Sequence, residues 1–287
     1  MNDIFDTTPC ELGEGPLWHP TRQQFFWFDI VGRRLHTSEA GKTRTVQFDE
    51  HVSAAGWVDD QSLLIASETR LFVFDLDRER SEDVEGLEPD NALNRSNDGR
   101  ADPWGGFWIG TMAKQNAYQG QGAIYRYFKG ELRTLYPGIA IPNAICFSPD
   151  RSFAYYADTT TQKIMRQGLD AETGWPDGDP KVWLDLAADG LFPDGAVVDA
   201  EGNLWNAQWG AGRVACYDPE GRFQRAVTFE AAHTSCPAFG GTEMTTLFCT
   251  TALQALSAEN KARTDKNGMV FAAHDVAKGQ AEHQVLL

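Results

Sequence analysis

The chain has 287 residues, a length that allows two average domains or one large all-β domain. It carries 25 Lys and Arg against 41 Asp and Glu, a formal net charge of −16, so its surface repels nucleic acid and anionic membranes. No apolar run reaches the roughly 18–20 residues that cross a bilayer, and the N-terminal residues lack the basic and apolar regions of a signal peptide. We therefore expect a folded cytoplasmic protein that binds neither nucleic acid nor a membrane.

In chain order, short aromatic and β-branched runs alternate with clusters of Gly, Pro, Asp and Asn, a pattern typical of strands joined by turns. Strands are predicted, among others, at residues 24–30, 107–112, 153–158 and 204–209. The only predicted helix covers residues 253–263 and belongs to a loop. The expected fold class is all-β.

Six segments of the chain can be superposed on one another, with intervals of 40 to 51 residues between their starting points. One four-stranded blade of a β-propeller occupies about 40 to 50 residues. The pattern predicts a six-bladed β-propeller that forms a single domain over residues 1–287. Closure of the ring predicts that an N-terminal strand at 3–8 completes the last blade beside residues 269–274. The six segments start at Glu14, Ala54, Asn97, Asn143, Asp194 and Ser235.

Equivalent positions of the innermost strands are expected to converge on one mouth of the central channel, and five of the six starting residues are polar. Glu14, Asn143 and Asp194 supply two carboxylates and one carboxamide, hard oxygen ligands that favour Ca²⁺, Mg²⁺ or Mn²⁺ over a thiolate-bound zinc ion. Two carboxylates at one mouth repel each other unless a cation lies between them or one acid is protonated. The pattern indicates a cation site with positions open for substrate.

Each of these three residues also fits a purely structural role. Asp194 and Asn143, taken alone, are typical turn formers. Glu14 stands between two glycines, which suits a surface turn as well as a close approach of two backbones. Their recurrence at equivalent positions is what favours a shared site.

The segment at residues 93–112 places Arg95 and Asn97 directly before a strongly apolar strand. The Arg95 guanidinium can bind a substrate oxygen, or it can form an ion pair with Asp98 or Asp102 that orders the loop. The sequence leaves both roles open.

The six histidines and five cysteines are scattered along the chain without the spacing of a metal motif. We interpret the cysteines as small core residues. The histidines indicate neither a histidine-based metal site nor a Ser-His-Asp triad.

Four motifs resemble the regucalcin/gluconolactonase family of six-bladed propellers, which hydrolyse sugar lactones. They are LGEGPLW at 12–18, LNRSNDGRADPWGGFWIGTM at 93–112, IPNAICFSPD at 141–150 and FPDGAVVDAEGNLW at 192–205. The resemblance implies that Glu14, Asn143 and Asp194 hold one divalent cation and that Arg95 and Asn97 contact the substrate. Some relatives carry a substrate-contacting Glu where this chain has Gln115, so we expect a changed substrate preference.

The hypothesis from the sequence is a metal-dependent hydrolase that opens an aldonolactone, a small-molecule sugar lactone, to the sugar acid. The cation would polarise the lactone carbonyl. Asp194 or a hydroxide on the cation would supply the base, and residues 114–122 would form a rim that tunes specificity. Two alternatives remain: an organophosphate or other ester hydrolase, and a noncatalytic propeller that binds a cation or a protein. The sequence leaves open which sugar lactone and ring size the protein uses, which cation it holds (Ca²⁺, Mg²⁺, Mn²⁺, Zn²⁺ or Fe²⁺), and whether it is a monomer or a small homo-oligomer.

Overall fold

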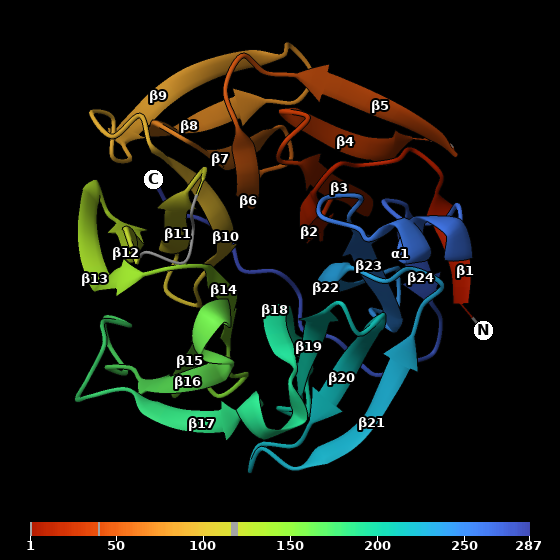
Figure 1. The fold of residues 1–287 in the computed structure, drawn as a ribbon. Helices are drawn as coiled ribbons and strands as arrows, with labels where there is room; N and C mark the ends of the chain where they lie inside the picture. The colour runs from red at the N-terminus through yellow and green to blue at the C-terminus, as the bar shows by residue number, and fades with distance from the viewer. Residues whose placement is uncertain (1, 40, 116–119) are drawn as a thin grey trace.

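The computed structural model describes residues 2–39, 41–115 and 120–287. These residues form six four-stranded antiparallel sheets arranged as blades around a central axis (Figure 1), which confirms the predicted six-bladed β-propeller. The first blade contains β2 Gly13–His19, β3 Gln24–Asp29, β4 Arg34–Glu39 and β5 Lys42–Gln47. The second contains β6 Val52–Asp59, β7 Ser62–Ser67, β8 Arg70–Asp75 and β9 Arg80–Gly86. The third contains β10 Asn94–Ala101, β11 Phe107–Ala113, β12 Gly122–Phe128 and β13 Glu131–Ile139. The next two are β14 Pro142–Phe147, β15 Phe153–Asp158, β16 Lys163–Gly168 and β17 Lys181–Asp185; and β18 Phe192–Val198, β19 Leu204–Trp209, β20 Arg213–Tyr217 and β21 Phe223–Thr228.

The sixth blade combines both ends of the chain. It contains β22 Thr234–Gly240, β23 Thr246–Thr251 and β24 Val270–Ala273, and β1 Asn2–Asp6 pairs antiparallel with β24 as the outermost strand. The ring is therefore closed by backbone hydrogen bonds between the first and last strands of the chain.

The core lies between adjacent blades. Every residue of β2, β14 and β22 is buried, whereas the outer strands β5, β9 and β21 are largely exposed. Six apolar clusters fill the six seams; between the third and fourth blades, for example, the rings of Trp108 and Phe147 meet edge to face at 5.5 Å. The second strands of the blades, such as β3, β7 and β11, are also buried along almost their whole length, which explains why they read as nearly continuous apolar runs.

The helix α1 Ala258–Arg263 lies in the β23–β24 connection, as expected, but it begins later than the predicted 253–263. The Ser257 side chain accepts a hydrogen bond from the Asn260 backbone amide at 3.1 Å, and this cap sets the start of the helix. No helix in the described part of the chain is long and apolar enough to cross a membrane.

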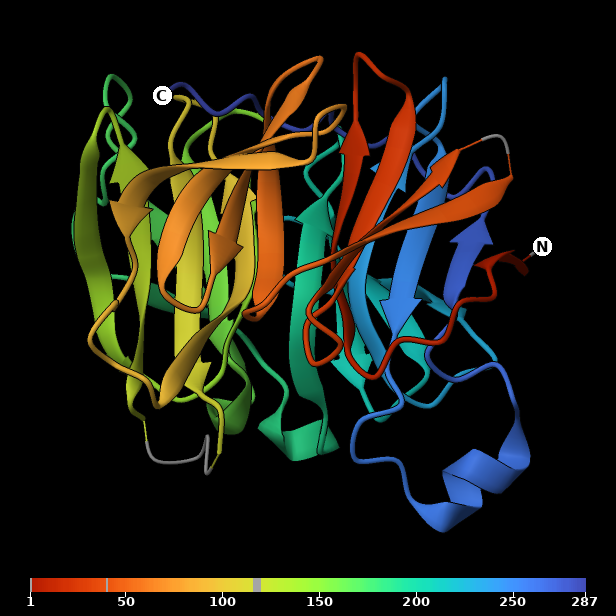
Figure 2. The ribbon, with the colours of Figure 1, turned by 90° about the horizontal axis from the view of Figure 1, so that it is seen from above.

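The C-terminal segment 276–287 crosses the face of the ring opposite α1 (Figure 2). Its backbone bonds to the ends of inner strands, as Val285 N–H does to Trp57 O at 2.9 Å. We call the centre of the ring, where the six innermost strands meet, the hub. Below the hub, the buried Arg100 guanidinium donates to Ile145 O at 3.2 Å and to Ala196 O at 3.3 Å. It also pairs with Glu282 of the C-terminal segment. Three blades and the C-terminal segment thus meet on one arginine.

Candidate active site at the hub of the propeller

The innermost strand of every blade has an irregular register with its neighbour near its start. The irregularities lie between Glu14 and Leu17, Val52 and Ala54, Ser96 and Gly99, Asn143 and Cys146, Pro193 and Ala196, and Thr234 and Pro237. Irregular pairing of this kind redirects a side chain away from its normal face of the sheet. Five predicted positions stand at or inside these irregularities: Glu14, Asn97, Asn143, Asp194 and Ser235. The second blade needs one correction, because the residue inside its irregularity is Ser53 rather than Ala54.

The glycines on either side of Glu14 allow the chain to pack where a side chain would collide. Gly15 has φ +51°, and a Cβ there would lie 2.2 Å from Ser53 O. A Cβ on Gly13 would lie 2.5 Å from Thr251 O. Of the two roles considered for these glycines, the structure has the close approach of backbones, and it buries Glu14 to 4% exposure.

A chain of hydrogen bonds fixes the orientation of the Asn143 amide. Its Nδ2 donates to Thr159 Oγ1 at 2.8 Å, and Thr159 Oγ1 donates its own hydrogen to Pro193 O at 2.7 Å. Because the only hydroxyl hydrogen of Thr159 is used, its oxygen must accept, so the NH₂ group of Asn143 faces Thr159. Asn143 Oδ1 therefore points the other way, where it accepts from Asn97 Nδ2 at 3.0 Å.

Asn97 links this amide to Arg95. Its Nδ2 also donates to Pro142 O at 2.9 Å, and its Oδ1 accepts from Arg95 Nη1 at 2.8 Å. Arg95 Nη1 donates further to Ser96 O at 2.8 Å. The structure thus brings Arg95, Asn97 and Asn143 into one buried hydrogen-bonded row.

The ion pair considered for Arg95 is not formed among the described residues. Asp98 Oδ2 accepts from the Ile145 backbone amide at 2.8 Å, and Asp102 pairs with Arg126 at 2.6 Å. Arg95 therefore orders no loop through either acid, and its guanidinium remains at the hub.

The carboxylates at the hub disfavour one another's charge. Burial, together with the Asp98 charge, raises the pKa of Glu14 to about 8. Burial and the charges of Glu14 and Asp98 raise the pKa of Asp194 well above its usual range, and burial raises the pKa of Asp98 to about 6. Arg95 opposes these effects, but burial also lowers its own pKa, to about 10. The hub thus gathers more buried negative charge than its arginine offsets.

Glu14, Asn143 and Asp194 could hold a divalent cation. All three are at least 95% buried, and their donor atoms are oxygens, with the amide oxygen of Asn143 turned away from Thr159. A cation would relieve the repulsion that raises the two carboxyl pKa values. The donor chemistry fits a hard cation of the Ca²⁺, Mg²⁺ or Mn²⁺ type.

Two other predicted positions lie differently. Ser235 stands at the equivalent position of the sixth blade, but its hydroxyl donates to Gly13 O and is hydrogen-bonded to Thr250 Oγ1, so it joins two blades. Gln115 is exposed at the end of the segment that follows β11. Residues 116–119 of the predicted rim at 114–122 lie outside the described residues.

Sequence reasoning missed Thr159 and Glu68. Thr159 lies directly after β15 and accepts a hydrogen bond from the Asn143 side chain of the neighbouring strand β14. No motif in the sequence signals this contact. The Glu68 charge acts on Arg95, and its carboxylate pairs with His51 and, at 3.1 Å, with Lys114. Both residues directly follow the second strand of a blade, β15 or β7, and this position is the only signal that could have found them.

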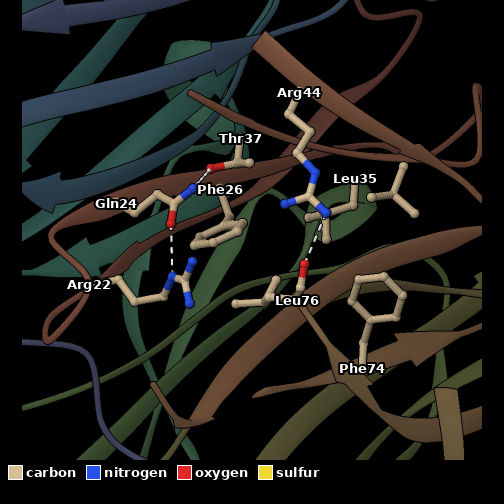
Figure 3. A pocket seen from close by; sticks show the side chains of 9 residues that line it. Arg22, Gln24, Phe26, Leu35, Thr37, Arg44, Phe74 and Leu76 are labelled. Carbon is tan, nitrogen blue, oxygen red and sulfur yellow. Dashed lines mark hydrogen bonds between the residues drawn. The ribbon is translucent and has the colours of Figure 1, made fainter. Parts of the chain in front are cut away.

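A separate small cavity lies between the first two blades (Figure 3). Gln24 Oε1 accepts from Arg22 Nε at 2.9 Å, and Gln24 Nε2 donates to Thr37 Oγ1 at 2.8 Å. Arg44 Nη2 donates to Leu76 O at 3.0 Å. The polar groups that line this cavity are hydrogen-bonded within the protein, and the other lining residues are apolar (Figure 3). We therefore interpret the cavity as a gap in the packing between the two blades and not as a substrate site.

Comparison with known proteins agrees with the fold and the motifs. A family model described as SMP-30/gluconolactonase/LRE-like region matches residues 12–253. The crystal structure of regucalcin from Agrobacterium tumefaciens str. C58, described as a calcium-binding protein, is similar with a TM-score of 0.97 and 37% identity, covering 100% of this chain and 98% of that one.

Two enzymes are similar over most of their length. An L-arabinolactonase of Azospirillum brasilense is 33% identical over 278 residues, 94% of this chain and 90% of the relative. A 6-deoxy-6-sulfogluconolactonase of Pseudomonas putida is 31% identical over 277 residues, 96% of this chain and 94% of the relative. The chain belongs to the SMP-30/gluconolactonase/LRE-like family, as its four motifs predicted.

Proposed function

We propose that this protein is a metal-dependent hydrolase that opens a sugar lactone to the corresponding sugar acid. The observation that carries the proposal is the burial of three oxygen donors from three blades, Glu14, Asn143 and Asp194. Glu14 and Asp194 are close enough for their charges to interact, and Asn143 is hydrogen-bonded to the row of Asn97 and Arg95. Relatives named as lactonases at 31–33% identity support the substrate class.

Glu14, Asn143 and Asp194 would hold one divalent cation. When bound, such an ion supplies Lewis acidity to the lactone carbonyl and offsets the negative charge that develops on its oxygen. Asn143 is oriented for this role by Thr159, which prevents the amide from turning its NH₂ group toward the hub.

The remaining steps fall to the side chains of the chain itself. Asp194 would accept a proton from the attacking water, a role that typically contributes about 10²- to 10⁴-fold. Within the described residues, only Nη1 of Arg95 is engaged in hydrogen bonds, which leaves Nη2 to donate to a sugar oxygen. Asn97 would orient the sugar beside it, and Gln115, which is exposed after β11, would contact the outer part of the substrate.

Glu14→Gln and Asp194→Asn test the proposal because each removes one charge with little change of shape. We expect both variants to bind a divalent cation less tightly and to lose lactone opening. Cation binding is measured by calorimetry after chelation, and hydrolysis by a pH indicator with the spontaneous reaction subtracted.

Glu11→Gln and Asp189→Asn are matched controls, since both side chains are exposed and lie close in sequence to the two tested residues. If Glu14→Gln and Asp194→Asn keep the turnover of these controls, the proposed site is wrong. A panel of lactones and phosphotriesters distinguishes lactone opening from a general ester hydrolase.

A further inference from the structure

A second cluster of potential metal ligands lies in the seam between the first and sixth blades, where the ring closes. Cys10 belongs to the connection between β1 and β2, Asp29 ends β3, and His36 lies in β4. All three are at least 98% buried, and one donor atom from each lies within 4.8 Å of the other two. The three residues are separated by up to 26 positions in the chain, so the fold alone brings them together.

The His36 ring has an unsatisfied nitrogen in this seam. Its Nδ1 bonds to Thr45 Oγ1 at 2.9 Å, on the side of the outermost strand of the blade. Its Nε2 is buried and has no hydrogen-bond partner among the described residues. The ring stacks on Trp27 with centroids 5.4 Å apart, which fixes its plane. Leaving a buried polar nitrogen unpaired costs about 1–3 kcal/mol, so its presence needs an explanation.

Of the other two side chains, Asp29 is fixed in orientation by backbone amides, and the Cys10 thiol makes only a long contact. Asp29 Oδ1 accepts from the backbone amides of Leu12 at 3.0 Å and Gly32 at 3.1 Å, which sets the carboxylate orientation. The nearest hydrogen-bond acceptor of the Cys10 thiol is Thr8 O, at a long 3.9 Å. Burial lowers the pKa of His36, which keeps its imidazole neutral and able to donate a lone pair.

We propose that Cys10 Sγ, an Asp29 carboxylate oxygen and His36 Nε2 bind a thiophilic divalent cation of the Zn²⁺ type. Zinc–ligand distances of about 2.0–2.3 Å place neighbouring ligands of a tetrahedral site roughly 3.5 Å apart. The three donors, which lie within 4.8 Å of one another, would therefore move together by up to roughly 1.3 Å on binding. Coordination replaces the hydrogen on sulphur, and the thiol proton passes to solvent. The mixed sulphur, nitrogen and oxygen ligands differ in kind from the oxygen-only hub.

The position of the site suggests its effect. Cys10 is tied to the sixth blade, because its N–H donates to Gly268 O at 2.9 Å and its carbonyl accepts from Leu253 N–H at 3.3 Å. Asp29 and His36 belong to the first blade. A cation held by all three would therefore join the two blades whose contact closes the ring. Its binding would stabilise the folded state by an amount that grows with the logarithm of the free cation concentration divided by Kd.

Cobalt(II) tests this proposal, since a bound thiolate gives a near-ultraviolet sulphur-to-cobalt charge-transfer band that oxygen ligands do not give. Metal-free protein is unfolded in guanidinium with a reductant and refolded with Co²⁺, so that the buried seam can load. We expect one equivalent of thiolate-bound cobalt per chain. Cys10→Ser should abolish the band, and His36→Gln should weaken binding by at least about tenfold in competition with a chelator.

Two controls separate this site from the hub. Glu14→Gln should keep the band, whatever it does to lactone hydrolysis. Cys236→Ser should also keep it, although the Cys236 thiol lies near the hub carboxylates. Circular dichroism confirms that each variant is folded. Cobalt binding by the wild type without a thiolate band, a band that survives Cys10→Ser, or wild-type affinity in His36→Gln would each overturn the proposal.

Discussion

Thr159→Val is the sharpest test of how the hub is organised, because valine keeps the branched shape and removes only the hydroxyl. The change deletes the 2.8 Å bond from Asn143 Nδ2 and the 2.7 Å bond to Pro193 O. A buried donor left without a partner costs about 1–3 kcal/mol, and the Asn143 amide becomes free to turn. Loss of such an orienting contact typically weakens a metal site by about 10- to 100-fold, which corresponds to roughly 1.4–2.7 kcal/mol.

The assay is cation affinity by calorimetry on chelated protein, with lactone opening measured in parallel. Thr159→Ser retains the hydroxyl and should bind the cation almost as the wild type does. Thr161→Val is the matched control: it removes an exposed hydroxyl that donates to Asp158 O at 2.8 Å, and it should leave affinity unchanged. If Thr159→Val binds the cation as tightly as Thr161→Val, the amide is not positioned in the way described and the reasoning fails.

Two further predictions concern charge at the site. Burial raises the pKa of Glu14 from 4.5 to about 8 in the metal-free fold, so the folded state favours the protonated acid. The contribution of the protonated acid to the free energy of unfolding is fully present below about pH 4.5. It is lost as the pH rises through about 8. Metal-free Glu14→Gln should therefore gain in unfolding free energy relative to the wild type from about pH 5 to 8, as measured by guanidinium unfolding, and a difference independent of pH would contradict the shift. Gln115→Glu adds a carboxylate in the predicted rim and should change the order of kcat/KM among pentono- and hexonolactones; an unchanged order would remove Gln115 from substrate selection.

Features that repeat along the chain could be predicted from the sequence. The spacing of the six segments indicated six blades, because each blade is a local unit of consecutive strands. The same alignment selected Glu14, Asn143 and Asp194, since equivalent positions of a symmetric ring share one axis. The buried strand at Gln24–Asp29 was predicted to within one residue from its aromatic run.

Features that depend on contacts between blades could not be predicted. The choice of Ser53 over Ala54 depends on where the β6–β7 register shifts, which is visible only in the pairing. Thr159 acts through a bond to a side chain of another strand, and a single threonine in a connection carries no signal of that contact. The grouping of Cys10 with His36 follows from ring closure, and their spacing in the chain resembles no metal motif.

The C-terminal segment across the far face has a consequence for turnover. Arg100 and Glu282 are at least 91% buried, and their ion pair joins the innermost strand of the third blade to the C-terminal segment that crosses this face of the ring (Figure 2). With the C-terminal segment across this face, a substrate would enter the hub and a product would leave it through the opposite face of the ring. With the proposed site at the hub, a bound sugar acid would have to leave before the next lactone could bind, and the turnover number would depend on the rate of product release.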